Sequence, residues 1–291
     1  METRVSNNDN EFGDAALVLL GHGSTVNADS SAPVYQHAAA LRGRKLFASV
    51  REGFWKQEPR LIPLLESLVE PRVFIVPVFI SEGYFTEQVI PRALGLRTPG
   101  QPAYTRVRRQ GEKTLCYCAP VGAHPRLAEA LVARAQTVVA EHPFPRAPKP
   151  AETALFLAGH GTPKNENSRQ AIEQHAAAIR ARRLYAEVHA VFLEEEPRIA
   201  DFHRLTACQE VVMVPCFISD GMHAYEDIPV LLGEPERVVR ERLQRGQWPW
   251  RNPTEKSGKR VWLSGSVGTD PIIAEVILER VRDCFRDVPA I

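Results

Sequence analysis

The sequence has little cysteine, almost no net charge and no long apolar run, and each of these absences excludes a class of protein. Its five cysteines form no CxxC pair, so neither a disulfide framework nor a structural zinc site is expected. The 36 Lys and Arg against 35 Asp and Glu leave a net charge of +1, which argues against nucleic acid as a partner. No stretch approaches the roughly 18 apolar residues of a membrane span, so no membrane partner is expected either.

The N-terminal segment lacks an apolar stretch as well. Residues 1–14, METRVSNNDNEFGD, are polar and have no hydrophobic region of a signal peptide. We therefore expect a disordered tail at 1–14 on a cytoplasmic protein. The rest is rich enough in apolar residues, at 44% of the whole chain, to form one large or two ordinary domains.

An internal repeat organises this remainder. His22 and His160, the histidines of two Gly-His-Gly motifs, lie 138 positions apart, and the same offset relates Pro59 to Pro197. An offset that stays constant over such a stretch indicates two copies of one structural unit. We expect an N-terminal lobe at 15–142, a Pro-rich linker at 143–153 and a C-terminal lobe at 154–288.

Each copy alternates apolar runs with helix-like segments in the order βαβαβαβα. The run VFIVPVFI at 73–80 is apolar throughout, which is typical of a parallel strand buried on both faces. The pattern predicts an α/β fold of two tandem lobes, each a four-stranded parallel sheet in the order 2-1-3-4 flanked by helices. A cleft between the lobes is part of this expected architecture.

Three side chains able to bind a metal follow apolar runs of the second copy. His160 follows TALFLAG, Glu194 follows AEVHAVFL, and His223 follows the run that begins VVMVPCFIS. Because parallel strands end at one edge of a sheet, these side chains should converge there. Two imidazoles and a carboxylate suit iron, cobalt, nickel or zinc. Taken alone, each of these residues could have no functional role; Glu194, for example, could be an ordinary solvated charge. Their occurrence at three separate strand ends favours a single metal site built from all three.

The first copy has lost this set. It keeps His22 but has Lys56 in the place of Glu194 and Phe85 in the place of His223. A cation and an apolar ring cannot complete a divalent-metal site, so the reacting site is expected in the C-terminal lobe and a degenerate one in the N-terminal lobe.

The combined motifs resemble a known family. The patterns GHG-T/S, FLE-x-x-P, P-x-F-I-S-x-G-x-H-x-x-x-D-I-P and G-x-x-P follow the successive strands. They resemble the class II tetrapyrrole chelatases of the CbiX/SirB type in their two-lobed long form, over roughly 15–140 and 154–287. One departure is that many two-lobed relatives of the sirohydrochlorin type have the intact site in the N-terminal half.

The resemblance implies ATP-independent insertion of Co²⁺ or Fe²⁺ into sirohydrochlorin, in cobalamin or sirohaem biosynthesis. It makes His160, His223 and Glu194 both the metal-binding and the catalytic residues. It implies no organic cofactor, because the divalent metal (Co²⁺, Fe²⁺ or Ni²⁺) and the tetrapyrrole are the two substrates. Neutral histidines would deliver the metal and accept pyrrole protons, and Glu194 would relay those protons.

Sirohydrochlorin carries eight carboxylates, so bidentate arginines are candidates for holding its rim. The residues expected to contact the substrate are His22, Tyr84, Phe85, Ser219, Arg240 and Arg245. Two other kinds of function remain open at this point: a metal-binding carrier or sensor without chelatase activity, and a hydrolase with a metal-bound water. The oligomeric state also stays open.

Overall fold

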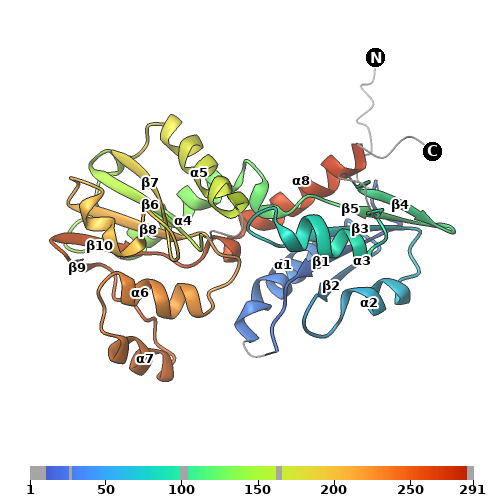
Figure 1. Cartoon of the computed structure of the whole chain (residues 1–291), viewed down its shortest axis with the longest axis horizontal. Coiled ribbons are helices and arrows are strands. Elements are labelled where there is room, and N and C mark those ends of the chain that lie inside the picture. The colour runs from blue at the N-terminus through green and yellow to red at the C-terminus, as the bar shows by residue number, and fades with distance from the viewer. Residues whose placement is uncertain (1–10, 26–27, 99–103, 162–165, 287–291) are drawn as a thin grey trace, which may run out of the picture. The chain divides into compact units, whose positions relative to one another are not determined.

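The computed structural model describes residues 11–25, 28–98, 104–161 and 166–286 (Figure 1). They form two compact units. Unit 1 comprises the described residues of 1–79, 84–121 and 277–291, and unit 2 comprises those of 80–83 and 122–276.

The sheet of unit 1 has five strands in the order β2-β1-β3-β5-β4. The first four are mutually parallel, and β4 pairs antiparallel with β5 at the edge. Their bounds are β1 (Ala15–Gly21), β2 (Ser49–Phe54), β3 (Arg72–Pro77), β4 (Val107–Gln110) and β5 (Lys113–Tyr117). The predicted order of parallel strands is therefore confirmed, and the prediction of four strands is corrected to five.

Unit 2 repeats this sheet in the order β7-β6-β8-β10-β9, again with an antiparallel edge strand, β9. In Figure 1 its strands lie between α5 on one side and α6 on the other. Their bounds are β6 (Thr153–Gly159), β7 (Glu187–Phe192), β8 (Glu210–Pro215), β9 (Thr254–Lys256) and β10 (Lys259–Leu263). The α/β class is thus confirmed for both halves of the chain.

Helices cover both faces of each sheet, because alternate strand residues point to opposite sides. The helical segments of the first half are η1 (Ala28–Ser30), α1 (Ala32–Gly43), α2 (Leu61–Ser67), the π-helix η2 (Phe85–Val89), α3 (Ile90–Ala93), η3 (Val121–Ala123) and α4 (Leu127–Glu141). Those of the second half are η4 (Pro150–Glu152), α5 (Glu166–Ala181), η5 (Ile199–Arg204), the π-helix η6 (His223–Asp227), α6 (Ile228–Leu231), α7 (Glu236–Gln244), η7 (Val267–Thr269) and α8 (Ile272–Arg286).

One face of the unit 2 sheet forms a core with η5, α6 and the buried Trp250. Phe156, Val211 and Val261 of three adjacent strands pack there with Phe202 of η5. The other face is covered by α5, which contacts β6 and β7, and by α4, which contacts β8 and β10. Burial on both sides explains why β6 is apolar along its whole length.

The units exchange their last long helices. Helix α4 follows β5 of unit 1 in the chain but belongs to unit 2, and α8 passes at Ile277 from unit 2 into unit 1. Within unit 1, Phe285 of α8 packs edge-on against Phe12 and Phe74. The compact units therefore differ from contiguous lobes at 15–142 and 154–288, because each unit includes a helix, or part of one, from the other repeat.

The expected tail and linker are each partly described. Residues 1–10 lie outside the described residues, whereas 11–14 form turns, and Phe12 is buried against Phe47. The linker residues 143–147 are exposed, and the carbonyl of His142 just before them accepts a bond from the indole N–H of Trp262 at 2.9 Å. All five cysteines are free thiols. Across the described ranges, no helix has both the length and the apolar character needed to cross a membrane.

Candidate metal centre

The first part of the site is the turn that ends β6. Gly161 has φ +64°, and a Cβ there would lie 2.7 Å from Cγ of Glu195, so glycine suits both the backbone and the space. The Nδ1 atom of His160 lies 2.7 Å from the carbonyl oxygen of Gly161. Because a carbonyl oxygen only accepts, Nδ1 carries the proton, and neutral His160 has its lone pair on Nε2.

Glu194 follows β7 and is bonded to the same turn. Its backbone N–H donates to the carbonyl of His160 at 3.1 Å. Its Oε1 lies 3.9 Å from Nε2 of His160, and the Glu194 side chain is 54% exposed. Since 3.9 Å is too long for a hydrogen bond, the two side chains face each other across a gap.

His223 is the first residue of the π-helix η6 and Asp227 is the last. The wider turn of a π-helix is a feature frequently found at functional sites. Nδ1 of His223 lies 2.7 Å from Oδ2 of Asp227, and a carboxylate that accepts this proton keeps the lone pair on Nε2. The rings of His160 and His223 are perpendicular, with centroids 4.9 Å apart.

These three side chains line one cavity of about 330 Å³. Its wall also carries the carboxylates of Glu226, Asp227 and Glu236, and the guanidinium of Arg240. The Arg240 side chain bonds Glu236, so the remaining carboxylates make the cavity negative and favourable for a cation. In the described part of the chain, no three His, Cys, Asp or Glu side chains form a preassembled metal-binding group, so His160, Glu194 and His223 line this cavity without yet being closed around an ion.

Unit 1 has the same geometry without the same chemistry. Nδ1 of His22 lies 3.0 Å from the carbonyl of Gly23. The rings of His22 and Phe85 are 5.0 Å apart at 87°. The pKa of His22 is lowered, mainly because the ring is buried. The hydrogen bond to Gly23 raises this pKa, and the nearby Lys56 cation lowers it further. The residue that corresponds to Asp227 is Val89, so the imidazole and its carboxylate partner are both missing from η2.

Of the residues predicted to contact the substrate, Arg240 is the one that lines this cavity. Tyr84 is 60% exposed and meets the Phe85 ring edge-on in unit 1. The carbonyl of Ser219 accepts a bond from the Ser266 hydroxyl at 3.0 Å. Arg240 lines the cavity, whereas Arg245 lies exposed at the end of α7 and is not part of its wall.

The sequence reasoning missed the role of Asp227. The available signal was the spacing His-x-x-x-Asp, because residues four apart share one face of a helix. Glu226 belongs to η6 itself, three residues after His223. Glu236 had no comparable signal, since it reaches the cavity through the packing of α7 against η6.

Comparison with known proteins decides the family. The family model of CbiX matches residues 16–138 and 154–284, on both sides of the Pro-rich linker. The chain belongs to the CbiX family. A protein of Halobacterium salinarum, named probable sirohydrochlorin cobaltochelatase, is 42% identical over 278 residues, which cover 92% of this chain and 91% of the relative.

Solved structures share the fold of this chain. A multi-domain protein of Deinococcus radiodurans, described as structurally similar to chelatases, matches with a TM-score of 0.73 and 34% identity over 91% of this chain. The match covers 54% of that longer chain, which has two additional novel domains. The CbiX that makes sirohaem in denitrifying bacteria has the same fold, with a TM-score of 0.59 and 22% identity over 92% of this chain and 98% of its own. The predicted family and its enzyme class, metal chelatase, are confirmed.

Proposed function

We propose that this CbiX protein inserts Co²⁺ or Fe²⁺ into sirohydrochlorin without ATP, in cobalamin or sirohaem biosynthesis. The observation that carries the proposal is the convergence of His160, Glu194 and His223 on one cavity of unit 2. The Halobacterium salinarum relative that is 42% identical is named a cobaltochelatase, which favours Co²⁺ over Fe²⁺ as the physiological metal.

The metal is a substrate, so its ligands must bind it and release it. Nε2 of His160, Nε2 of His223 and the Glu194 carboxylate are the proposed ligands, a set that suits Co²⁺ and Fe²⁺. The bonds from Nδ1 to Gly161 and to Asp227 orient the two rings. The open 3.9 Å gap between His160 and Glu194 leaves room for an ion.

The reaction also moves two protons. Two pyrrole N–H protons leave the macrocycle as the M²⁺ ion enters, so the charge of the product balances that of the reactants. We assign the acceptance of these protons to the imidazoles of His160 and His223, which are 38% and 45% exposed. Glu194 is the most exposed of the three, and we assign it the transfer of protons to solvent.

The proposed substrate contact in this cavity is Arg240, whose guanidinium could bind a substrate carboxylate in exchange for Glu236. Five further residues are proposed to contact the tetrapyrrole: Ser219 and Arg245 of unit 2, and His22, Tyr84 and Phe85 of unit 1. Each of them can be tested by an alanine substitution and a measurement of KM.

The decisive experiment mixes purified protein with sirohydrochlorin and either Co²⁺, Fe²⁺ or Ni²⁺, and follows the absorption spectrum of the macrocycle. We expect a protein-dependent conversion that is fastest with Co²⁺. Binding of Co²⁺ without any conversion of the macrocycle would instead establish the metal-binding carrier or sensor.

Glu194→Gln should lower turnover by about tenfold to a hundredfold, because the amide keeps the shape but neither balances charge nor carries a proton. Tetrapyrrole affinity measured without metal should stay within about twofold of wild type. If the variant lost tetrapyrrole affinity and kept wild-type turnover at saturation, Glu194 would be a substrate-binding residue instead.

Asp227→Ala should weaken Co²⁺ binding by about tenfold to a hundredfold, because His223 loses the acceptor that holds its ring and its tautomer. The matched control is Val89→Ala at the corresponding position of unit 1, which should leave Co²⁺ affinity unchanged. Calorimetric titration of both variants with Co²⁺ checks the prediction, and equal affinities for the two would contradict it.

A further inference from the structure

The three consecutive glutamates after β7 do not point the same way. Glu194 faces His160 across the cavity, but Glu195 lies over the back of the turn, with Cγ and Oε1 each 2.7 Å from the position of a Cβ on Gly161. Oε1 of Glu195 is buried and has no hydrogen-bond partner in the described part of the chain. The Glu195 side chain therefore packs directly against Gly161, whose carbonyl orients His160.

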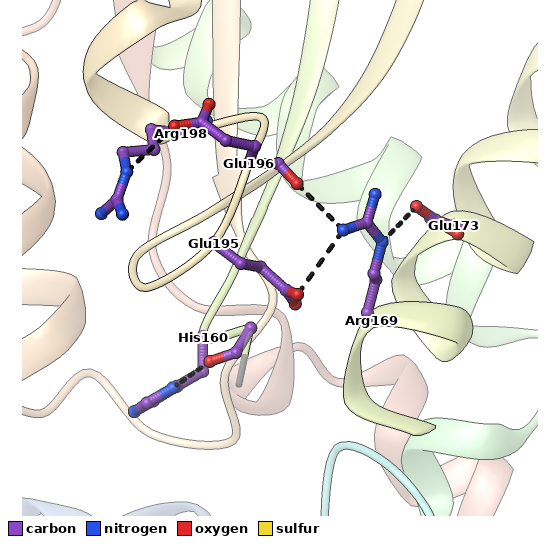
Figure 2. Close-up of polar contacts among 7 residues, drawn as sticks. His160, Arg169, Glu173, Glu195, Glu196 and Arg198 are labelled. Atoms are coloured by element: carbon purple, nitrogen blue, oxygen red, sulfur yellow. Dashed lines mark hydrogen bonds and ion pairs between the residues drawn. The ribbon is translucent and has the colours of Figure 1, made fainter. Parts of the chain in front are cut away.

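Arg169 of α5 connects this carboxylate to the rest of the unit. Its Nη1 donates to Oε2 of Glu195 at 3.5 Å and to the carbonyl of Glu196 at 3.0 Å, and its Nε donates to Glu173 at 2.8 Å (Figure 2). The guanidinium also lies over the ring of Phe192, 5.4 Å from its centroid. One side chain thus links α5, the end of β7 and the loop that carries Glu194.

Unit 1 provides a natural comparison, because it has the same turn without the complete set of ligands. The residues there that correspond to Arg169 and Glu195 are Ser31 and Gln57. Gln57 packs on Gly23, with Cγ 2.8 Å from the position of a Cβ, and its Oε1 accepts the backbone N–H of Ser24 at 2.8 Å. A neutral amide therefore suits the position behind the turn, and the charge pair occurs only beside the candidate metal centre.

We propose that Arg169 is a positioning residue: by compensating the Glu195 carboxylate packed behind the His160–Gly161 turn, it keeps that turn and the Glu194 loop in the arrangement needed to bind the metal. This inference rests on the proposed function of the site. The pair is effective because the Arg169 cation compensates the partly buried carboxylate and keeps it directed away from the cavity. Without that cation the carboxylate would be left uncompensated, and it would relax at the expense of the turn on which it packs.

A double-mutant cycle tests the pair. Arg169→Ser should weaken Co²⁺ affinity and lower kcat by about tenfold or more, in the range found for residues that orient metal ligands. Glu195→Gln should stay within about threefold of wild type, because Gln57 occupies the same place in unit 1. The double variant Arg169→Ser with Glu195→Gln should recover most of the loss, since it removes the uncompensated charge and reproduces the Ser31 and Gln57 pairing.

Recovery by a second substitution is an effect that simple damage to the fold would not produce. Thermal unfolding of all variants serves as the control, and Co²⁺ affinity is measured calorimetrically without tetrapyrrole. The proposal is overturned if Arg169→Ser binds Co²⁺ like wild type, or if the double variant is as weak as Arg169→Ser. If wild type binds Co²⁺ but converts no sirohydrochlorin, the proposed function fails, while the affinity pattern still decides the role of the pair.

Discussion

Replacing His160 or His223 by alanine should reduce metal insertion by at least about a hundredfold, the loss typical for a positioned acid or base. Each ring supplies one of the two Nε2 lone pairs that face the cavity, and their Nδ1 atoms are occupied by Gly161 and Asp227. The remaining ring and Glu194 cannot hold an ion and accept the pyrrole protons together. The measurement is steady-state turnover of sirohydrochlorin with Co²⁺.

The matched control is Phe85→Ala, because Phe85 takes the place of His223 in unit 1 and meets His22 in the same perpendicular geometry. This variant should keep measurable turnover, within about tenfold of wild type. His160 and His223 are 38% and 45% exposed, so their loss should leave stability within about 0.5 kcal/mol. Equal losses in all three variants, or unfolding of the histidine variants, would refute the assignment of the site to unit 2.

Installing the missing side chains in unit 1 should create a second metal site, raising the Co²⁺ stoichiometry from one to two per chain. The variant is Lys56→Glu, Phe85→His and Val89→Asp, which supplies the carboxylate, the second imidazole and its partner. The scaffold is already suitable, because the backbone N–H of Lys56 donates to the carbonyl of His22 at 2.9 Å, as Glu194 does to His160.

The electrostatics of His22 also favour this gain. Burial lowers the pKa of His22, so its imidazole stays neutral to lower pH and its lone pair is available to a metal. Substituting Lys56 additionally removes a cation that would repel M²⁺. The number of ions bound is measured by equilibrium dialysis, with Phe85→His alone as the control that should not add a full site. A stoichiometry of one for the triple variant would mean that the two edges differ in more than these three residues.

The parallel part of the fold could be predicted from sequence because continuous apolar runs mark strands that are buried on both faces. The edge strands β4 and β9 could not, since VRRQ and TEK are polar and short. Their signal was the turn that follows each of them, where Gly111 has φ +61° and Gly258 has φ +72°. Two-residue turns with such glycines join antiparallel strands into hairpins.

The assignment of α4 and part of α8 to the unit of the other repeat also could not be predicted from the sequence. Each helix follows the last parallel strand of its own repeat and carries apolar residues along its length. Which sheet a helix covers depends on the path of the short connection before it. That path is a property of the folded chain, and the spacing of apolar residues in the sequence does not indicate it.

The sequence by itself determined the repeat, the class of fold and the family, and it indicated His160, Glu194 and His223 as the candidate metal ligands, because strand ends and motif spacing are local features of the chain. Tertiary structure alone decided how these side chains are arranged. The ring orientations, the pairing of Asp227 with His223, and the contact of Arg169 with Glu195 depend on hydrogen bonds between separate elements. The geometry of such bonds is set by how helices and strands pack, so no pattern of residue types could have indicated that adjacent glutamates face opposite sides of one turn.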